Sequence, residues 1–166
     1  MIVNLQRKIK LDAKTFKPFV VDLILSIDEA QGCDIAVAFV SDRRMKELNK
    51  FFRGKTSTTD VLSFPHEPDE FEEHSKLKFA EPNEYSKLQF AEQQPPKGSA
   101  QNSFLGDIVI SVEQAQKQAE ENGLTLEAEI KQLMLHGVLH LCGYDHETDD
   151  GEMNERELEL RDKLGL

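Results

Sequence analysis

The sequence predicts a single α+β domain in which a small mixed β-sheet of about four strands packs with about five helices. Its 166 residues suit one hydrophobic core better than two small domains. Hydrophobic residues make up 39% of the chain and charged residues 31%, a balance typical of globular proteins. Short apolar or alternating segments are interspersed with longer segments that have helical periodicity. We therefore expect residues 1–166 to form one domain.

Four segments have the patterns of β-strands. The first alternates polar and apolar residues, as in a strand with one buried face. The second is nearly continuous in small and β-branched apolar residues, which predicts a central strand buried on both faces. The third ends at Pro65, and the fourth follows Gly106. In order, the predicted strands cover residues 1–10, 34–40, 60–64 and 107–111.

Five segments have helical periodicity, and capping residues precede three of them. Ser41 precedes a short helix, Ser111 and Gln114 have the spacing of a capping box, and Thr125 precedes a longer helix. The apolar face of the short helix consists of Met45, Leu48 and Phe52. The predicted helices cover about 13–31, the segment after Ser41, residues 112–122, the segment from Thr125 to Gly143, and an acidic terminal segment with Met153, Leu160 and Leu164.

A low-complexity segment at about 67–103 interrupts these patterns. It is rich in Glu, Gln, Pro and Lys, and it contains the related sequences SKLKFAE at 75–81 and SKLQFAE at 86–92. Two copies are too few for a self-supporting repeat structure. We interpret this segment as a tolerated inserted loop rather than a dedicated binding element.

The charge distribution is uneven. With 20 Lys and Arg against 31 Asp and Glu, the chain has a net charge of -11, which disfavours a generic nucleic-acid-binding protein. One strip is nevertheless basic and contains a single acidic residue, Glu47. The basic residues of this strip are Arg43, Arg44, Lys46, Lys50, Arg53 and Lys55.

The cysteine count and hydropathy indicate a cytoplasmic protein. No apolar run approaches the roughly 20 residues that a membrane-spanning helix needs, and no signal peptide is visible. Cys33 and Cys142 are the only cysteines, and their contexts are unrelated. We therefore expect a reducing compartment and no membrane association.

The segment HGVLHLCGYDH, from His136 to His146, contains three of the five histidines of the chain. His136 and His140 are four residues apart, so they stand on one face of a helix, and two imidazoles can converge on one cation. Gly143 can adopt the left-handed conformation that reverses the chain after a helix, which would bring His146 towards the other two. The sequence therefore predicts a metal cleft formed by this helix and the following turn.

Three neutral imidazoles suit zinc, and three protein ligands leave a fourth position for water, as in catalytic zinc sites. Zinc lowers the pKa of its bound water towards about 7, which provides a nucleophile at neutral pH. We therefore predict one catalytic zinc ion per chain and a hydrolase. A structural zinc with Cys142 as fourth ligand is the alternative, but Cys142 is two residues from His140 and points away on a helix.

The spacing also resembles the metzincin peptidase signature H-E-x-x-H-x-x-G-x-x-H, with one departure. Gly137 stands where these peptidases have the Glu that acts as general base. Peptidase activity is thereby disfavoured. Because glycine in a helix interior costs about 1 kcal/mol relative to alanine, Gly137 suggests that room for substrate or backbone is needed beside the metal.

Three segments together resemble the YbeY family of metal-dependent endoribonucleases. They are the histidine segment at His136–His146, the segment NKFFRGKTSTTDVLSFP at Asn49–Pro65, and the segment GDIVIS at Gly106–Ser111. The three motifs have the order of the family, and the resemblance covers nearly the whole chain except the insertion. It implies an α+β fold with zinc in a cleft, cleavage of single-stranded RNA, and a role in the 3′ maturation of small-subunit ribosomal RNA and in ribosome quality control.

By the same motif match, the zinc ligands are His136, His140 and His146, and Arg53 is the functionally important arginine that holds a phosphate. Arg53 and His136 are thus the candidate catalytic residues. Phosphodiester cleavage needs stabilisation of charge on the phosphoryl oxygens, which a guanidinium can supply. The other candidate substrate-binding residues, which would follow the RNA strand, are Arg43, Arg44, Lys50 and Lys55. Expected partners are ribosomal RNA and the ribosome or its proteins.

Four further polar residues lie near these motifs. We expect Asp145 to hydrogen-bond a ligand imidazole rather than to transfer a proton. Asp60 and Asp107 open strands and are expected to order the local backbone. His66 follows a strand and is expected to be an exposed loop residue.

Two other functions are compatible with the motif. One is a zinc peptidase or amidase in which a carboxylate outside the motif replaces the missing Glu. The other is a non-catalytic ribosome assembly factor whose zinc only stabilises the fold. Chelation distinguishes the second, because removal of a structural zinc should unfold the domain.

Overall fold

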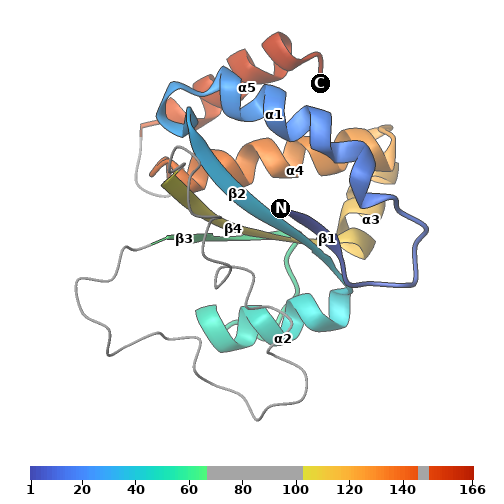
Figure 1. The fold of residues 1–166 in the computed structure, drawn as a ribbon. Coiled ribbons are helices and arrows are strands. Elements are labelled where there is room, and N and C mark those ends of the chain that lie inside the picture. Colours follow the sequence, from blue (N-terminus) through green and yellow to red (C-terminus); the bar gives the residue numbers. More distant parts are fainter. Residues whose placement is uncertain (67–102, 146–149) are drawn as a thin grey trace, which may run out of the picture.

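The computed structural model describes residues 1–66, 103–145 and 150–166 (Figure 1). The predicted insertion, apart from Ser103, and the predicted ligand His146 lie outside these residues. Over the described residues, four strands and five α-helices form a mixed α+β fold. The predicted fold class is confirmed.

The four strands form one sheet in the order β1-β2-β4-β3. β2 runs parallel to β1 and to β4, and β3 runs antiparallel to β4. β3 is therefore an edge strand, and the two longest strands pair at the centre. The strands are β1 (Ile2–Asn4), β2 (Cys33–Val40), β3 (Val61–Pro65) and β4 (Ser103–Ser111).

The first strand is shorter than the sequence predicts and ends at Asn4 instead of residue 10. Side chains bind the backbone that follows: Asn4 Nδ2 donates to the Leu11 carbonyl at 3.0 Å, and Gln6 Oε1 accepts from the N–H groups of Lys8 and Ile9. These bonds favour a turn over an extended strand. β4 is longer than predicted because Ser103 and Phe104 also pair with β2.

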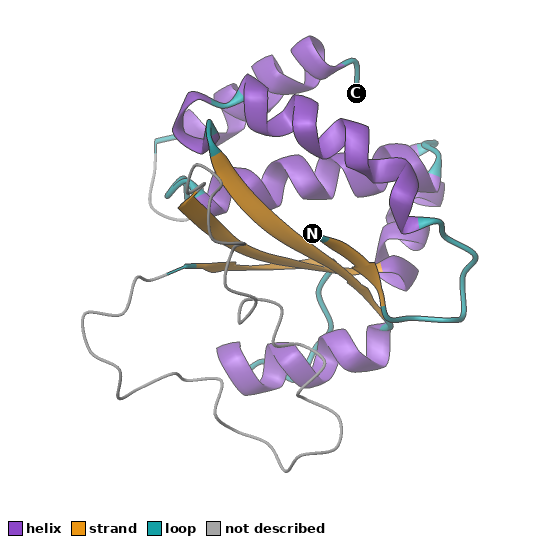
Figure 2. Cartoon of the chain, viewed as in Figure 1, coloured by secondary structure: helices purple, strands orange, loops and turns teal. Residues whose placement is uncertain are grey.

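The helices follow the predicted order, and Figure 2 shows their extents. The first predicted helix, 13–31, is divided into a central α-helix between two 3-10 turns, Ala13–Phe16 and Asp28–Ala30. Pro18 lies in the first turn of the α-helix, and Ile27 ends it with an extended backbone, φ -112° and ψ 112°. The five are α1 (Lys17–Ser26), α2 (Asp42–Arg53), α3 (Val112–Asn122), α4 (Leu126–Leu141) and α5 (Glu152–Leu164).

The sheet separates two apolar clusters. α1, α4 and α5 lie on one face and α2 lies on the other (Figure 1). Alternate residues of β4 face opposite sides: Ile108 and Ile110 join the main core with α1 and α4, whereas Val109 packs with Met45 and Leu48 of α2. The main core is the larger of the two clusters, so α4 is anchored by burial along much of its length.

Phe52 differs from its prediction as a core residue. Met45 and Leu48 are buried as expected, but 37% of Phe52 is exposed. Phe52 lies in the last turn of α2, where its ring contacts Phe64 of the edge strand β3 with centroids 4.8 Å apart. Because β3 is an edge strand, it covers only part of the Phe52 ring.

The predicted helix caps form. Ser41, Ser111 and Thr125 each accept a hydrogen bond from the backbone N–H three residues later. The predicted capping box of Ser111 and Gln114 is only half present, because the Gln114 side chain donates instead to Asp42 of α2 at 3.0 Å. The second half of the box is thus exchanged for a contact between two helices.

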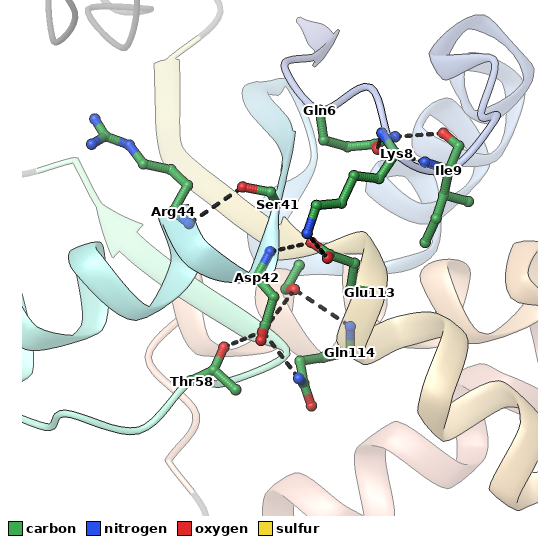
Figure 3. A network of polar contacts seen from close by, with 10 residues as sticks. Gln6, Lys8, Ile9, Ser41, Asp42, Arg44, Thr58, Glu113 and Gln114 are labelled. Atoms are coloured by element: carbon green, nitrogen blue, oxygen red, sulfur yellow. Dashed lines mark hydrogen bonds and ion pairs between the residues drawn. The ribbon is translucent and has the colours of Figure 1, made fainter.

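Asp42 is the centre of a polar network that fixes α2 against the rest of the fold (Figure 3). Its Oδ1 accepts from Thr58, on the segment that leads to β3, and from Gln114 of α3. Its backbone N–H donates to Glu113, which also binds Lys8. The network connects α2, α3 and two loops, so the position of α2 does not depend on its small apolar cluster alone.

Candidate metal centre

His136 and His140 stand on one face of α4, as the sequence predicts. Their Nε2 atoms are 3.1 Å apart, and their ring centroids are 4.7 Å apart at an interplanar angle of 81°. Both side chains are partly buried. Two imidazole nitrogens thus converge on one point beside the helix.

The other nitrogen of each imidazole has an acceptor. His136 Nδ1 is 2.9 Å from Glu157 Oε2, and His140 Nδ1 is 2.9 Å from the carbonyl oxygen of Tyr144. A carbonyl or ionised carboxylate can only accept, so each Nδ1 carries the proton. When both imidazoles are neutral, each Nε2 presents a lone pair and the two can share one cation. A proton on one Nε2, which makes that ring an imidazolium, also lets the two nitrogens hydrogen-bond at 3.1 Å.

Glu157 on α5 keeps the His136 ring in this orientation. Burial disfavours the ionised form of Glu157, but the hydrogen bond and charge of His136 and the hydrogen bond from Arg161 outweigh burial and lower the pKa of the carboxyl. Arg161 contacts the second carboxylate oxygen at 2.5 Å. A carboxylate on the outer nitrogen of an imidazole is a recurrent feature of metal-binding histidines.

The turn after α4 has the conformation that the sequence predicts. Gly143 has φ 94°, and the N–H of Tyr144 donates to the Leu139 carbonyl at 3.1 Å, which reverses the chain. The reversal delivers the Tyr144 carbonyl to His140. His146, the third predicted ligand, lies just beyond and outside the described residues, so its role stays a prediction.

The described residues fit a zinc site in part. The separation of the two Nε2 atoms is short enough for one ion at about 2.0–2.1 Å from each nitrogen. Within the described part of the chain, no group of three or more His, Cys, Asp or Glu side chains is arranged to hold a metal. The described residues thus supply two ligands of the correct type and tautomer.

Cys142 is a partly buried thiol next to the main core. Burial, with smaller contributions from Glu29 and Cys33, raises the pKa of its thiol to about 11. Its side chain packs against the main core, and the prediction that it points away from the histidines stays a prediction.

Gly137 lies against the sheet, which leaves no room for a larger side chain at this position. A Cβ added there would lie 3.0 Å from two methyl carbons of Ile108 and 3.2 Å from Ser63 Oγ. The interpretation of Gly137 as room for substrate is therefore wrong, and its alternative, close approach of backbone, is correct. A Glu at this position would collide with β4, so the peptidase signature cannot be completed by a simple substitution.

A cavity of about 520 Å³ opens beside the two histidines. Arg53, the last residue of α2, lies in its wall with residues of β3, and Asp145 lines it from the turn after α4. Residues far apart in the sequence therefore meet at the β3 edge of the sheet, as the motif match implies. The described lining comprises Arg53, Thr59–Ser63, Pro65, His136, His140 and Gly143–Asp145.

The other basic residues divide into two groups. Arg43 and Arg44 interact with Glu47 at 3.6 and 3.0 Å and do not belong to the described cavity lining. Lys50 and Lys55 are exposed near Arg53 in the sequence, also outside that lining. The structure thus brings Arg53 to the histidines and leaves the rest of the basic strip on the outer surface.

Of the remaining polar candidates, Asp60 and His66 agree with their predictions and Asp107 does not. Asp60 Oδ1 accepts from the N–H of Val61 at 2.8 Å and so orders the local backbone, although Asp60 also lines the cavity. Asp107 does not open its strand, because β4 begins at Ser103, and its buried Oδ1 has no hydrogen-bond partner among the described residues. Burial raises the pKa of Asp107, opposed by the charges of His66 and the N-terminus. His66 is exposed at the end of β3.

Sequence reasoning missed Glu157 and the Tyr144 carbonyl. The acidic terminal helix contains several Glu residues, and only the packing of α5 on α4 selects one of them. A backbone carbonyl has no sequence signal of its own.

Among the helices of the described ranges, none has both the length and the apolar character that crossing a bilayer requires.

Comparisons with known proteins agree with these features. The family described as Endoribonuclease YbeY matches residues 1–165. A relative named Endoribonuclease YbeY from Caldanaerobacter subterraneus subsp. tengcongensis is 40% identical over 96% of this chain and 94% of its own length. Another of that name, from Nautilia profundicola, is 43% identical over 80% of this chain and 73% of its own.

A solved structure has a similar fold. The solution structure of a Thermotoga maritima protein matches with a TM-score of 0.55 and 26% identity, covering 99% of this chain and 89% of that one. Fold, motifs and sequence identity over almost the entire length agree. This chain therefore belongs to the YbeY family of endoribonucleases.

Proposed function

We propose that this protein is a zinc-dependent endoribonuclease that cleaves single-stranded RNA. The observation that carries the proposal is the pair of His136 and His140 Nε2 atoms, 3.1 Å apart, in a cavity that also contains Arg53. Membership of a family of endoribonucleases supports it. We further propose that the substrate is small-subunit ribosomal RNA, matured at its 3′ end, with a role in ribosome quality control in the cytoplasm.

The zinc site that we propose consists of His136, His140 and His146, with one ion per chain. Glu157 and the Tyr144 carbonyl hold the Nδ1 protons of the two described ligands. We propose that Asp145 accepts the hydrogen bond of the His146 imidazole in the same way. Asp145 lines the cavity and directly precedes His146 in the chain. A bound zinc ion would act as a Lewis acid on a phosphoryl oxygen and activate the attacking nucleophile.

Arg53 would bind the phosphate at the cleavage site. A guanidinium forms two parallel hydrogen bonds with phosphate oxygens, and these strengthen as negative charge develops on them. Arg53 and the histidines line the same cavity, so one phosphate can lie between them. Arg43, Arg44, Lys50 and Lys55 would follow the strand on either side, weakly for the two arginines because Glu47 already compensates them.

Cleavage of end-labelled single-stranded RNA tests this function, with wild type, chelated wild type and His136→Ala compared side by side. We expect cleavage of the single strand by untreated wild type alone. We expect untreated wild type to cleave a duplex of the same sequence more slowly. Equal cleavage in all three samples would identify a contaminating nuclease. No cleavage in any sample would contradict the proposal.

The same samples distinguish the other two functions. A ribosome assembly factor with structural zinc predicts that chelation unfolds the protein, which circular dichroism would detect. We expect the chelated protein to remain folded, because the described residues form two apolar clusters without using the histidines. If the protein were a zinc peptidase or amidase, it would hydrolyse peptide or amide substrates. The position of Gly137 has no room for the Glu that serves these peptidases as general base.

A further inference from the structure

Three phenylalanine rings form a continuous series at the end of α2. Phe51 and Phe52 are in edge-to-face contact with centroids 4.9 Å apart, and Phe52 contacts Phe64 of β3 at 4.8 Å. Phe51 is 63% exposed, although a large aromatic side chain is usually buried. The series therefore runs from the edge of the sheet out to solvent.

The aromatic series belongs to the same two elements as part of the cavity wall, the last turn of α2 and β3. Arg53, which lines the cavity, directly follows Phe52 in the chain. Ser63 and Pro65, the neighbours of Phe64 on β3, line the cavity too. Phe51 is two residues before Arg53, so both side chains project from the last turn of α2.

The charges around the aromatic series favour a polyanion. Glu47, the acidic residue of the basic strip, interacts with Arg43 and Arg44. Lys50 and Lys55 are exposed on either side of the phenylalanines, and neither has an ion pair within the described residues. With Arg53, these two lysines give the segment around Phe51 three positive charges and no acidic residue, while Lys46 lies one turn earlier on α2.

Local contacts hold this end of α2 rigid. Gly54 ends the helix with φ 67°, and its N–H donates to the Lys50 carbonyl at 3.1 Å. The buried Asn49 side chain donates to the Ser57 carbonyl at 2.8 Å and so fixes the segment after the helix. The Phe51 ring is therefore presented on an ordered support, which reduces the entropy lost on binding.

We propose that Phe51, supported edge-on by Phe52, is a stacking platform for an unpaired base of the RNA whose phosphate Arg53 binds. This inference rests on the proposed function. Bases stack on aromatic rings whatever their identity, and positive groove charges hold the backbone. A base inside a duplex is already stacked on both faces, so the platform would favour single strands over duplexes without sequence specificity.

Phe51→Ala is the direct test, read as the kcat and KM of cleavage of a short single-stranded RNA by the zinc-loaded protein. We expect KM to rise by about 5- to 140-fold, the range for loss of one stacked base. kcat at saturation and zinc content should stay unchanged. Leu25→Ala is the matched control, because Leu25 is 64% exposed on α1, on the opposite face of the sheet, and should leave KM unchanged.

A second variant reports stacking directly. The chain contains no tryptophan, so Phe51→Trp introduces a unique fluorophore that also preserves a stacking surface. We expect single-stranded RNA to quench its fluorescence, and an abasic strand of equal length to quench it far less. Equal quenching by both strands, or an unchanged KM for Phe51→Ala with active wild type, would overturn the platform alone. A wild type that neither binds nor cleaves single-stranded RNA would overturn the proposed function and the platform with it.

Discussion

Gly137→Ala tests whether close packing of α4 on the sheet maintains the candidate site. The added Cβ would meet Ile108 Cδ1 and Cγ2 at 3.0 Å and Ser63 Oγ at 3.2 Å. Ile108 is fully buried and pairs with Ser63 in the sheet, so neither can move away easily. Overpacking of this kind costs about 1–3 kcal/mol, and the helix propensity of alanine recovers about 1 kcal/mol. We expect a net loss of up to about 2 kcal/mol.

The assay is thermal unfolding followed by circular dichroism. For a chain of this size, a loss of 1 kcal/mol lowers Tm by about 2–4 °C, so Gly137→Ala should lower Tm by up to about 8 °C. Zinc content should be retained, because His136 and His140 move together on α4. Adding Ile108→Val removes Cδ1 and should recover part of the loss. A rise in Tm, as at an exposed helical glycine, would refute the reasoning.

Two further predictions concern single charges. Arg53→Glu should retain zinc and the wild-type Tm but lose RNA cleavage. Lys46→Glu is the control, because it reverses a charge on the same helix outside the described cavity lining, and it should cleave nearly normally. Normal cleavage by Arg53→Glu would rule out the phosphate role of Arg53. Burial raises the pKa of Asp107 above its ordinary value of 3.8. The folded state therefore binds the proton more tightly than the unfolded state, and the stability associated with this group is lost as pH rises through the folded pKa. Asp107→Asn should accordingly raise Tm at pH 7 but not at pH 3, and an equal change at both values would contradict this assignment.

The sequence predicts the central elements of the fold well because burial determines them. β2 is buried along most of its length, so its apolar run has one interpretation. α4 combines a capping residue, a regular apolar stripe and a terminal glycine, which agree with one another. The first strand was predicted too long because the side chains of Asn4 and Gln6 bind a turn, and alternation alone cannot detect such bonds.

The candidate site was predictable where its residues are adjacent on one helix. The spacing of His136 and His140 determines their convergence, and Gly143 indicates the turn that follows. Bringing Arg53 to the same cavity needs the pairing of β3 with β4 and the polar network of Asp42, which no local pattern encodes. Glu157 depends on how α5 packs, so it could not be chosen from its neighbours.

The candidate site therefore has two parts, and different elements of the fold hold each part in place. The histidine pair depends on α4, on the turn at Gly143 and on Glu157 of α5. Arg53 and the aromatic series depend on α2, on the opposite face of the sheet (Figure 1). Substitutions that disturb α2 should therefore affect RNA binding and leave zinc binding intact.

The central claim is that His136 and His140 bind the metal, and the zinc content of purified protein tests it most directly. Elemental analysis of wild type, His140→Ala and His66→Ala gives the number of zinc ions per chain, with His66 as the control because it is an exposed histidine outside the described cavity lining. We predict one zinc per chain for wild type and His66→Ala, and almost none for folded His140→Ala. Full zinc occupancy in His140→Ala would contradict the account.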